Sequence, residues 1–424
     1  MFKLFSWKSL ISSFVVFKGI FELYLQKRQF QKISKNHEIT TNLQGFDQSK
    51  IAKGIQYSLL KLKFNGFKII YESIIELIIV KFNLYYKIWS VSGWLLKQNN
   101  VVVENQTIYL SQTILFITLS SFLILIFEKL PMNYIDYFKI EKKFEFFKSG
   151  ILKWIMFECS MTLLQLFIDI LGIIVCLKSF QLFNFEIEIF KLSIITILFG
   201  CFVLFIYPTL SSFITKQNEL PEGELRKKIE DFTKDQNFEL KKIYVAEVSS
   251  TTSHSNASVE GNPLSGSVHL TDTLVDSFTD KEILAVVAHE LGHVKFGHRV
   301  KGMILVYVEI IISLSVLKLF YNDDSIYRSF DFNNKPIFIG HLIVKKISIP
   351  IDLIFKILKN YLQQNFEYQA DSFATNCGYK ESIKNALIRL TDQNLSTTSD
   401  DWLYSSFYNS HPSKIDRLNA IDKN

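Results

Sequence analysis

Hydrophobic residues along this chain are gathered into long blocks that polar segments separate. At about 1.5 Å per helical residue, a block of some 20 residues can cross the roughly 30 Å hydrocarbon core of a bilayer. Seven blocks are long enough, and they cover residues 8–26, 68–96, 107–128, 151–177, 190–214, 303–320 and 337–357. The third is the clearest, because Ile108 to Phe127 contains no charged residue. The pattern predicts a mainly α-helical, multi-pass membrane protein with about seven transmembrane helices.

Several of the predicted spans carry charged residues, among them Glu158, Asp169 and Glu309. A charge at the bilayer centre costs roughly 3 kcal/mol on insertion scales, so such side chains usually face a bundle interior or a wet cavity. A polar chamber lined by the helices is therefore one hypothesis. For lysines such as Lys81 and Lys318, the alternative is that the side chain extends to the membrane surface.

The distribution of Lys and Arg in the loops predicts an orientation. The loop after the first span is rich in basic residues and the 129–150 loop carries five lysines, whereas the 97–106 and 178–189 loops have one lysine each. Basic loops tend to stay in the cytosol. We therefore expect loops one, three and five and the C-terminal tail to be cytosolic, with the N-terminus in the lumen.

Composition narrows the function classes. The 424 residues are 48% hydrophobic and 15% aromatic, which excludes a disordered chain. The net charge of +6 comes without a basic run, so we expect no nucleic-acid partner. The four cysteines form no C-x-x-C pair, which argues against a thiolate metal site.

The spans divide the chain into four predicted regions: an N-terminal transmembrane region over 1–214, a cytosolic insert over 215–302, two further spans over 303–357 and a C-terminal segment over 358–424. The insert carries alternating and amphipathic patterns typical of a folded domain with a small sheet. It is predicted to contain a helix over 220–236, a strand over 242–248, a turn or exposed edge over 249–262 and a partner strand over 267–270.

A second helix of the insert carries chemistry. It is predicted to begin behind Thr279-Asp280 as N-cap, and it contains His289-Glu290-Leu291-Gly292-His293. At about 100° per residue, the two histidines lie about 40° apart on one face and can hold one metal ion. Glu290 can then act as a base on water that the metal activates. The motif predicts a zincin-type hydrolase; the alternative is a pair of structural histidines.

A catalytic zinc site needs a third protein ligand. His298 lies about 140° around the helix from His293, so we expect it to be a surface or helix-end residue. Glu367 is the better candidate, because Glu367 and Asp371 share one face if their segment is helical. Glu367 would bind the metal and Asp371 would orient a ligand histidine. A Glu–Asp pair on a solvated helix remains the alternative.

Five motifs in order along the chain resemble those of the type I CAAX prenyl proteases, integral-membrane zinc metalloproteases of the endoplasmic reticulum. They span nearly the whole chain and are Phe21–Gln29, Phe138–Phe146, Ser253–Ala257, Phe366–Asp371, and His411-Pro412 with Asp416-Arg417-Leu418. The resemblance implies seven helices around a large hydrophilic chamber, with one zinc ion per chain near its cytosolic side. It also implies a prenylated, farnesylated CAAX peptide as substrate, cleaved to release the last three residues, and we expect a monomer.

By the same resemblance, each candidate residue has an implied role. His289, His293 and Glu367 would be the zinc ligands, and Glu290 the general base. Asp371 would support the ligands. The remaining residues would bind substrate: His411 and Arg417 at the substrate carbonyl or oxyanion, Asn256 and Ala257 on an edge strand that pairs with the peptide. Placement in the endoplasmic reticulum membrane, with the inner nuclear membrane as a second site, follows from the resemblance alone.

The chain departs from the family pattern at several positions. The family usually has Gly where Glu145 or its neighbour stands, Trp where Val294 follows the second histidine, and Ser-Arg in place of Gln363-Gln364. None of these changes removes a candidate ligand or the base. Two other functions use the same fold: a protease for misfolded membrane proteins, and a translocon-clearing scaffold without catalysis.

Overall fold

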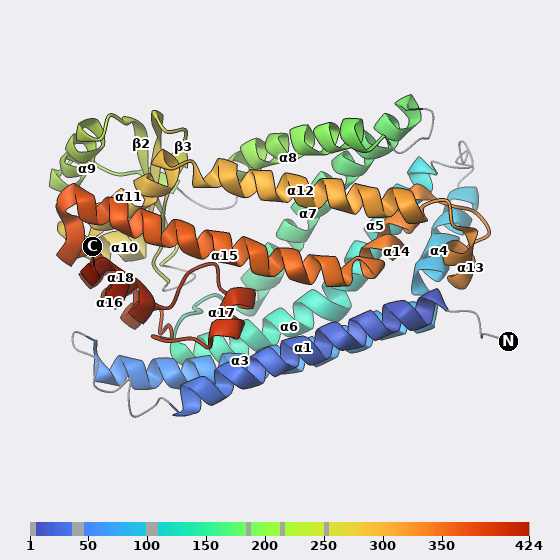
Figure 1. Ribbon diagram of the computed structural model, residues 1–424, viewed down its shortest axis with the longest axis horizontal. Coiled ribbons are helices and arrows are strands. Elements are labelled where there is room, and N and C mark those ends of the chain that lie inside the picture. The colour runs from blue at the N-terminus through green and yellow to red at the C-terminus, as the bar shows by residue number, and fades with distance from the viewer. Residues whose placement is uncertain are drawn as a thin grey trace.

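The computed structural model describes residues 6–35, 46–98, 109–183, 188–212, 217–249 and 254–423, and the side chains of 204–212 are outside the description. Long helices run along the long axis of the molecule, and a small sheet with short helices lies at one end (Figure 1). The chain begins near the opposite end, whereas its last helix lies beside the sheet domain. The mainly helical fold predicted from the sequence is confirmed.

The described residues of the seven predicted spans are almost all helical. The helices that contain them are α1 (Trp7–Lys35), α3 (Gln48–Lys81), α4 (Leu84–Gln98), α5 (Leu110–Ile124), α7 (Ile151–Leu182), α8 (Ile189–Ser212), α12 (His298–Phe320), α14 (Ile337–Ile347) and α15 (Ile349–Ala374). Residues 107–108 and 213–214 of the predicted spans lie outside the described residues. Among the described residues, four helices are long and apolar enough to cross a membrane: Trp7–Lys35, Leu110–Phe144, Ile151–Leu182 and His298–Phe320.

Two predicted spans are each made of two helices rather than one. The block at 68–96 is interrupted between α3 and α4, where Asn83 takes a left-handed conformation with φ of 52°. The block at 337–357 is interrupted at Ser348, and Pro350 then stands in the first turn of α15. Hydrophobicity alone predicted uninterrupted spans, because it does not register a backbone break inside an apolar block.

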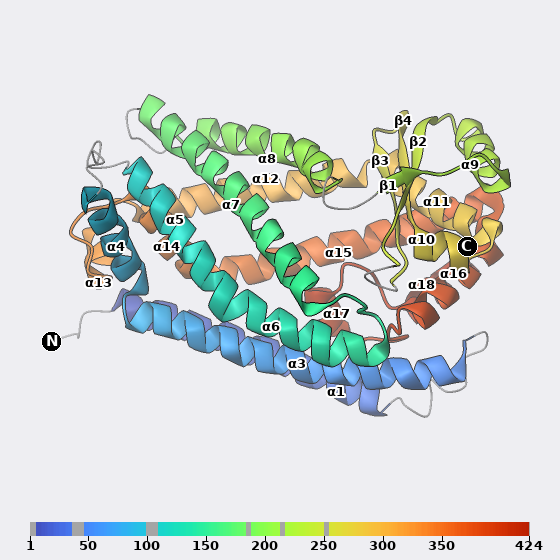
Figure 2. The same cartoon turned by 180° about the vertical axis from the view of Figure 1, so that it is seen from behind.

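Charged side chains inside the helical region form ion pairs. Glu309 of α12 lies 2.6 Å from Lys359 of α15, and Lys346 of α14 lies 3.0 Å from Glu76 of α3. Pairing between helices lowers the cost of keeping these charges away from bulk water. Each pair also links two helices that are distant in sequence. The back view shows two of them, α12 and α15, running side by side along the bundle (Figure 2).

The small sheet has four strands in the order β1-β2-β4-β3. Strand β2 pairs with β4 in parallel and β3 pairs with β4 antiparallel, so β3 is an edge strand. The helix predicted over 220–236 is shorter and begins at Glu224, because Leu220–Gly223 are not helical. The elements of this domain are β1 (Gln217–Glu219), α9 (Glu224–Asp235), β2 (Glu239–Ala246), β3 (Ala257–Gly261), β4 (Ser265–Thr271), α10 (Asp272–Ser277) and α11 (Asp280–Lys295).

Helix α11 forms the centre of this domain. Thr279 is its N-cap, as the sequence indicated, and forms a reciprocal capping box with Glu282. Nearly all residues from Glu282 to Gly292 are buried, against the sheet on one side and α15 on the other. A Cβ at Gly292 would lie 3.2 Å from Ala370 Cα. The missing side chain therefore lets α15 pass close to α11.

The remaining described elements connect or close the structure. They are a π-helical turn (Leu125–Lys129), α6 (Leu130–Tyr134), a second π-helical turn (Ile135–Ile140), a 3-10 turn (Glu141–Phe144), α13 (Asp324–Ser329), a third π-helical turn (Thr375–Tyr379), α16 (Lys380–Gln393), α17 (Trp402–Tyr408) and α18 (Lys414–Lys423). Helices α16 and α18 pack together beside α11 and α15, so the C-terminal segment lies directly against the helix that carries both histidines.

Candidate active site

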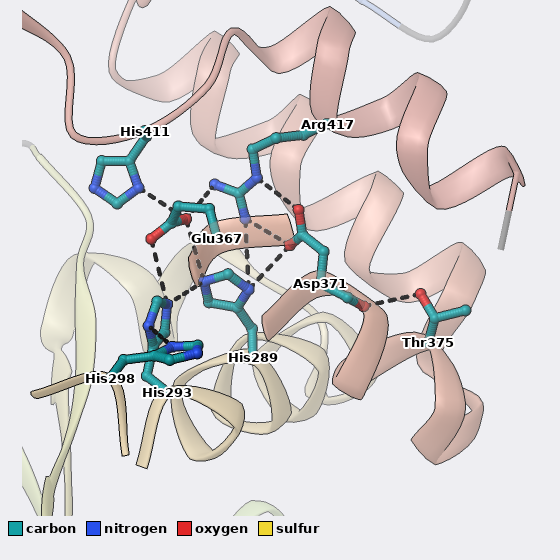
Figure 3. Close-up of polar contacts among 8 residues, drawn as sticks. All are labelled: His289, His293, His298, Glu367, Asp371, Thr375, His411 and Arg417. Atoms are coloured by element: carbon teal, nitrogen blue, oxygen red, sulfur yellow. Dashed lines mark hydrogen bonds and ion pairs between the residues drawn. The ribbon is translucent and has the colours of Figure 1, made fainter. Parts of the chain in front are cut away.

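Two histidines of α11 and one carboxylate of α15 meet at the centre of the site (Figure 3). His289 Nε2 and His293 Nε2 are 3.2 Å apart. One oxygen of Glu367 lies 3.4 Å from His289 Nε2, and the other lies 3.3 Å from His293 Nε2. Side chains that are more than seventy positions apart in sequence therefore point their donor atoms at one common space.

These distances fit a single small metal ion. Zinc binds His nitrogen and carboxylate oxygen at about 2.0–2.1 Å, and in a tetrahedron of that size neighbouring ligand atoms lie about 3.3 Å apart. The distances among His289, His293 and Glu367 match this spacing. Three protein ligands leave a fourth position open, which is the arrangement of a catalytic rather than a structural zinc site.

Asp371, one helical turn after Glu367, holds His289 from the other side of its ring. Asp371 Oδ1 lies 2.9 Å from His289 Nδ1, so Nε2 is left to face the metal position. Arg417 Nε and Nη2 donate to the two oxygens of Asp371 at 2.8 and 2.6 Å. Although burial opposes it, Arg417 and His289 lower the pKa of Asp371 to about 2. The carboxylate is therefore charged at neutral pH.

Glu367 lies in a similarly positive environment. His411 Nδ1 is 2.8 Å and Arg417 Nη1 is 3.0 Å from the same oxygen of Glu367. Burial would raise the pKa of Glu367, but the neighbouring histidines and Arg417 hold it far below its usual range. Burial alone would lower the pKa of His289, yet its contacts with Asp371 and Glu367 raise it to about 9. The carboxylates of Glu367 and Asp371 are therefore buried and negatively charged, which favours a bound cation.

A cleft of about 230 Å³ opens beside this cluster. Glu290 lines it, and burial raises the pKa of its carboxyl group, which favours a role in accepting a proton. Asn256 and Ala257, where strand β3 begins, also line the cleft. The backbone of Asn256 is held to Thr271 of β4 by hydrogen bonds of 3.0 and 3.1 Å.

His298 is not the surface residue that the sequence predicted. It is the first residue of α12, which agrees with a helix end, but only 5% of its surface is exposed. The ring stacks on Phe366 with centroids 4.2 Å apart, Nδ1 lies 3.0 Å from His293 Nδ1, and Nε2 lies 3.0 Å from Gln369 Oε1. Helix α11 ends at Lys295, and at Gly297, where φ is 64°, the chain turns and brings His298 back. The straight-helix geometry used for the prediction does not apply past that turn.

Two polar networks fix the segments around the cleft. In the first, Glu141 accepts a 2.6 Å hydrogen bond from the Tyr57 hydroxyl. A carboxylate oxygen of Glu141 also lies 3.5 Å from Nε2 of His254, which precedes strand β3 in the chain. His254 also stacks on Phe146, with ring centroids 4.2 Å apart. Asn394 Oδ1 accepts from the backbone N–H of Ser255 at 3.3 Å. The Phe138–Phe146 motif therefore contacts the Ser253–Ala257 motif, of which Ser253 lies outside the described residues.

The second network joins α1 to the segment that carries His411. Gln29 Nε2 donates to Asp400 Oδ1 at 2.5 Å, and Gln29 Oε1 accepts from the backbone N–H of Asp401 at 2.7 Å. Asn409, two residues before His411, donates to Asp400 Oδ2 at 2.9 Å. Gln364 adds a 2.9 Å hydrogen bond to the carbonyl of Asn409. Helix α1 thus contributes to the position of His411 although it carries no site residue.

The structure brings all the predicted site residues to one place. His289, Glu290, Glu367, His411, Arg417, Asn256 and Ala257 line the cleft, and His293 and Asp371 contact residues that do. Sequence reasoning missed Asn394 and Lys414, which also line the cleft. No motif marks either of them, and only the packing of α16 against α11 and of α18 against α15 and α16 places them there.

Comparisons with known proteins agree with this geometry. The profile of peptidase family M48 matches residues 219–424, and that of the CAAX prenyl protease N-terminal region, five membrane helices, matches residues 29–212. The chain is 32% identical to CAAX prenyl protease 1 of Saccharomyces cerevisiae over 98% of this chain and 95% of that protein. It is 31% identical to the probable CAAX prenyl protease 1 of Schizosaccharomyces pombe over 99% of this chain and 89% of that protein.

A solved structure is similar over the same range. The crystal structure of S. mikatae Ste24p has a TM-score of 0.91 and 31% sequence identity, covering 99% of this chain and 100% of that one. Similarity of this extent includes both the helical region and the domain with the histidine pair, so it is not limited to the metal motif. The chain therefore belongs to the CAAX prenyl protease 1 family, and it is a multi-pass membrane metalloprotease.

Proposed function

We propose that this protein is a zinc endopeptidase that removes the C-terminal tripeptide from prenylated, farnesylated CAAX proteins. The observation that carries the proposal is the mutual spacing of the donor atoms of His289, His293 and Glu367, which suits one tetrahedral ion with an open position. The names of the relatives support the substrate class. We also propose the four-region division of the chain, a location in the endoplasmic reticulum membrane and a cytosolic orientation of the site.

The residues of the site have distinct tasks in this reaction. When bound, zinc supplies Lewis-acid activation of a water molecule and of the peptide carbonyl. Glu290 takes the proton from the attacking water and returns it to the leaving amine. His411 donates to the developing oxyanion in this proposal, and its 57% exposed side chain on the cleft supports that role. Asp371 and Arg417 hold the ligands, because their shortest contacts are with each other, His289 and Glu367.

Strand β3 gives the substrate its register. It is an edge strand, and residues 256 and 257 at its start line the cleft. An extended peptide can add to such an edge through backbone hydrogen bonds without a requirement for particular side chains. The prenyl group would be accommodated by the apolar helical region or the surrounding bilayer.

The test uses purified protein in detergent and a farnesylated peptide that ends in a C-a-a-X sequence. We expect zinc-dependent release of the tripeptide, and a kcat about 10² to 10⁴ times lower for Glu290→Gln. Glu247→Gln, in the same domain but outside the cleft, is the matched control. Zinc-loaded wild-type protein that releases no tripeptide would exclude this function and favour the quality-control or scaffold alternatives.

A further inference from the structure

Lys414 is a half-buried cation that lines the cleft and that no feature of the reaction above uses. It is the first residue of α18, one helical turn before Arg417, and it lines the cleft together with His411 and Asn394. Within the described part of the chain, its ammonium group has no hydrogen bond or ion pair. An ammonium group that is partly withdrawn from water and lines a cleft without a partner is available to an anionic ligand.

The surroundings of Lys414 disfavour its charge further. Burial and the neighbouring Arg417 guanidinium lower the pKa of Lys414 to about 8. The residue also stands in the first turn of α18, where the helix dipole repels a cation. An anion bound beside the ammonium group would relieve each of these effects at once.

The other cations of the cleft are already engaged. Arg417 binds Asp371 and Glu367, and His411 contacts Glu367. Of the carboxylates near Lys414, Asp400 accepts hydrogen bonds from Gln29, Thr397 and Asn409. An anion that enters the cleft therefore meets Lys414 as the cation still available among the described residues.

We propose that Lys414 binds the C-terminal carboxylate of the peptide substrate and so selects a free chain end. This inference rests on the proposed function, in which three residues follow the scissile bond. Lys414 stands one helical turn before Arg417, which lies 3.0 Å from Glu367, so Lys414 lines the cleft beside the candidate metal centre. Asn394 can assist, because its side-chain oxygen accepts from Ser255 and its amide nitrogen is left to donate to the ligand.

The test measures binding rather than cleavage, on the Glu290→Gln protein. Two farnesylated peptides of the same sequence are compared, one ending in a free carboxylate and one in a C-terminal amide. We expect the free acid to bind about ten- to a hundredfold more tightly, as for a hydrogen bond to a charged group. Adding Lys414→Met should remove this preference, whereas Lys414→Arg should keep part of it.

Two controls make the result specific. Lys423→Met, at the exposed end of the same helix, should leave the preference unchanged. Lys414→Met should not lower the thermal unfolding midpoint, because it removes an unfavourable charge; a structural role would lower it. Equal binding of the two peptides, or a preference that survives Lys414→Met, would overturn the inference. Cleavage by the wild-type protein tests the proposed function separately, so either proposal can fail alone.

Discussion

At the scale of single residues, each candidate metal ligand is held by a further polar side chain. The second ring nitrogen of His289 contacts Asp371, and that of His293 contacts His298. Glu367 is contacted by His411 and Arg417. Such partners fix the orientation of a ligand before the metal arrives, so the affinity for the ion depends on residues that never touch it.

Asp371→Asn tests this support. The amide keeps the shape of the side chain but removes the charge that orients His289 and pairs with Arg417. We expect zinc affinity to fall about 10- to 100-fold, measured by competition with a chelator of known affinity. Asp422→Asn, which breaks an exposed ion pair with Lys384, is the control. Unchanged zinc affinity in Asp371→Asn would contradict the assigned role.

Gly292→Ala tests the close approach of the two metal-binding helices. The added Cβ would lie 3.1 Å from Phe373 Cβ and 3.2 Å from Ala370 Cα. Helix α15 would have to move outward, and Glu367 would move with it. We expect weaker zinc binding and a loss of about 1–3 kcal/mol of stability from overpacking. Gly302→Ala, where a Cβ meets open space, should change neither quantity.

At the scale of elements, segments far apart in sequence position the cleft. Helix α1 holds the Asp400–Asp401 turn before α17, and the segment after α6 holds His254 before β3. The motifs in these segments carry no catalytic residue. Their presence in the sequence is explained by the positions they impose on His411 and on the edge strand.

Gln29→Ala tests the contribution of α1. It removes one of the three donors to the carboxylate of Asp400 and the acceptor of the backbone N–H of Asp401. We expect a loss of about 1–3 kcal/mol in stability. A fall in kcat should accompany it, because the segment before His411 is loosened. Gln31→Ala is the matched control, since Gln31 is exposed on the same helix. Equal kcat values for the two variants would show that α1 does not position His411.

Some of these elements could be predicted from the sequence and others could not. The metal-binding helix and its Thr279–Glu282 cap follow from local chemistry, and so does the face shared by Glu367 and Asp371. The break at Asn83 leaves the hydrophobic pattern intact, so it has no sequence signal. His298 and Lys414 reach the site only through the turn at Gly297 and the packing of α18, which are tertiary effects.

At the scale of the whole molecule, a membrane-embedded helical bundle carries the hydrolytic site at one end (Figure 1). Helices α12 and α15 connect the helical bundle with the site. Helix α12 begins five residues after His293, and α15 carries Glu367 near its C-terminal end. The ion pair between Glu309 and Lys359 links these two helices within the bundle. We therefore expect a change in the packing of α12 against α15 to move Glu367 relative to His289 and His293.

The most direct test is the metal content of the purified protein, measured by mass spectrometry after dialysis without chelators. We expect about one zinc ion per chain in the wild-type protein and far less in Glu367→Ala and His289→Ala. Glu290→Gln should retain the metal, because Glu290 is placed as the base and not as a ligand. A wild-type protein that holds no zinc, or a Glu367→Ala protein that holds a full equivalent, would contradict the proposed centre.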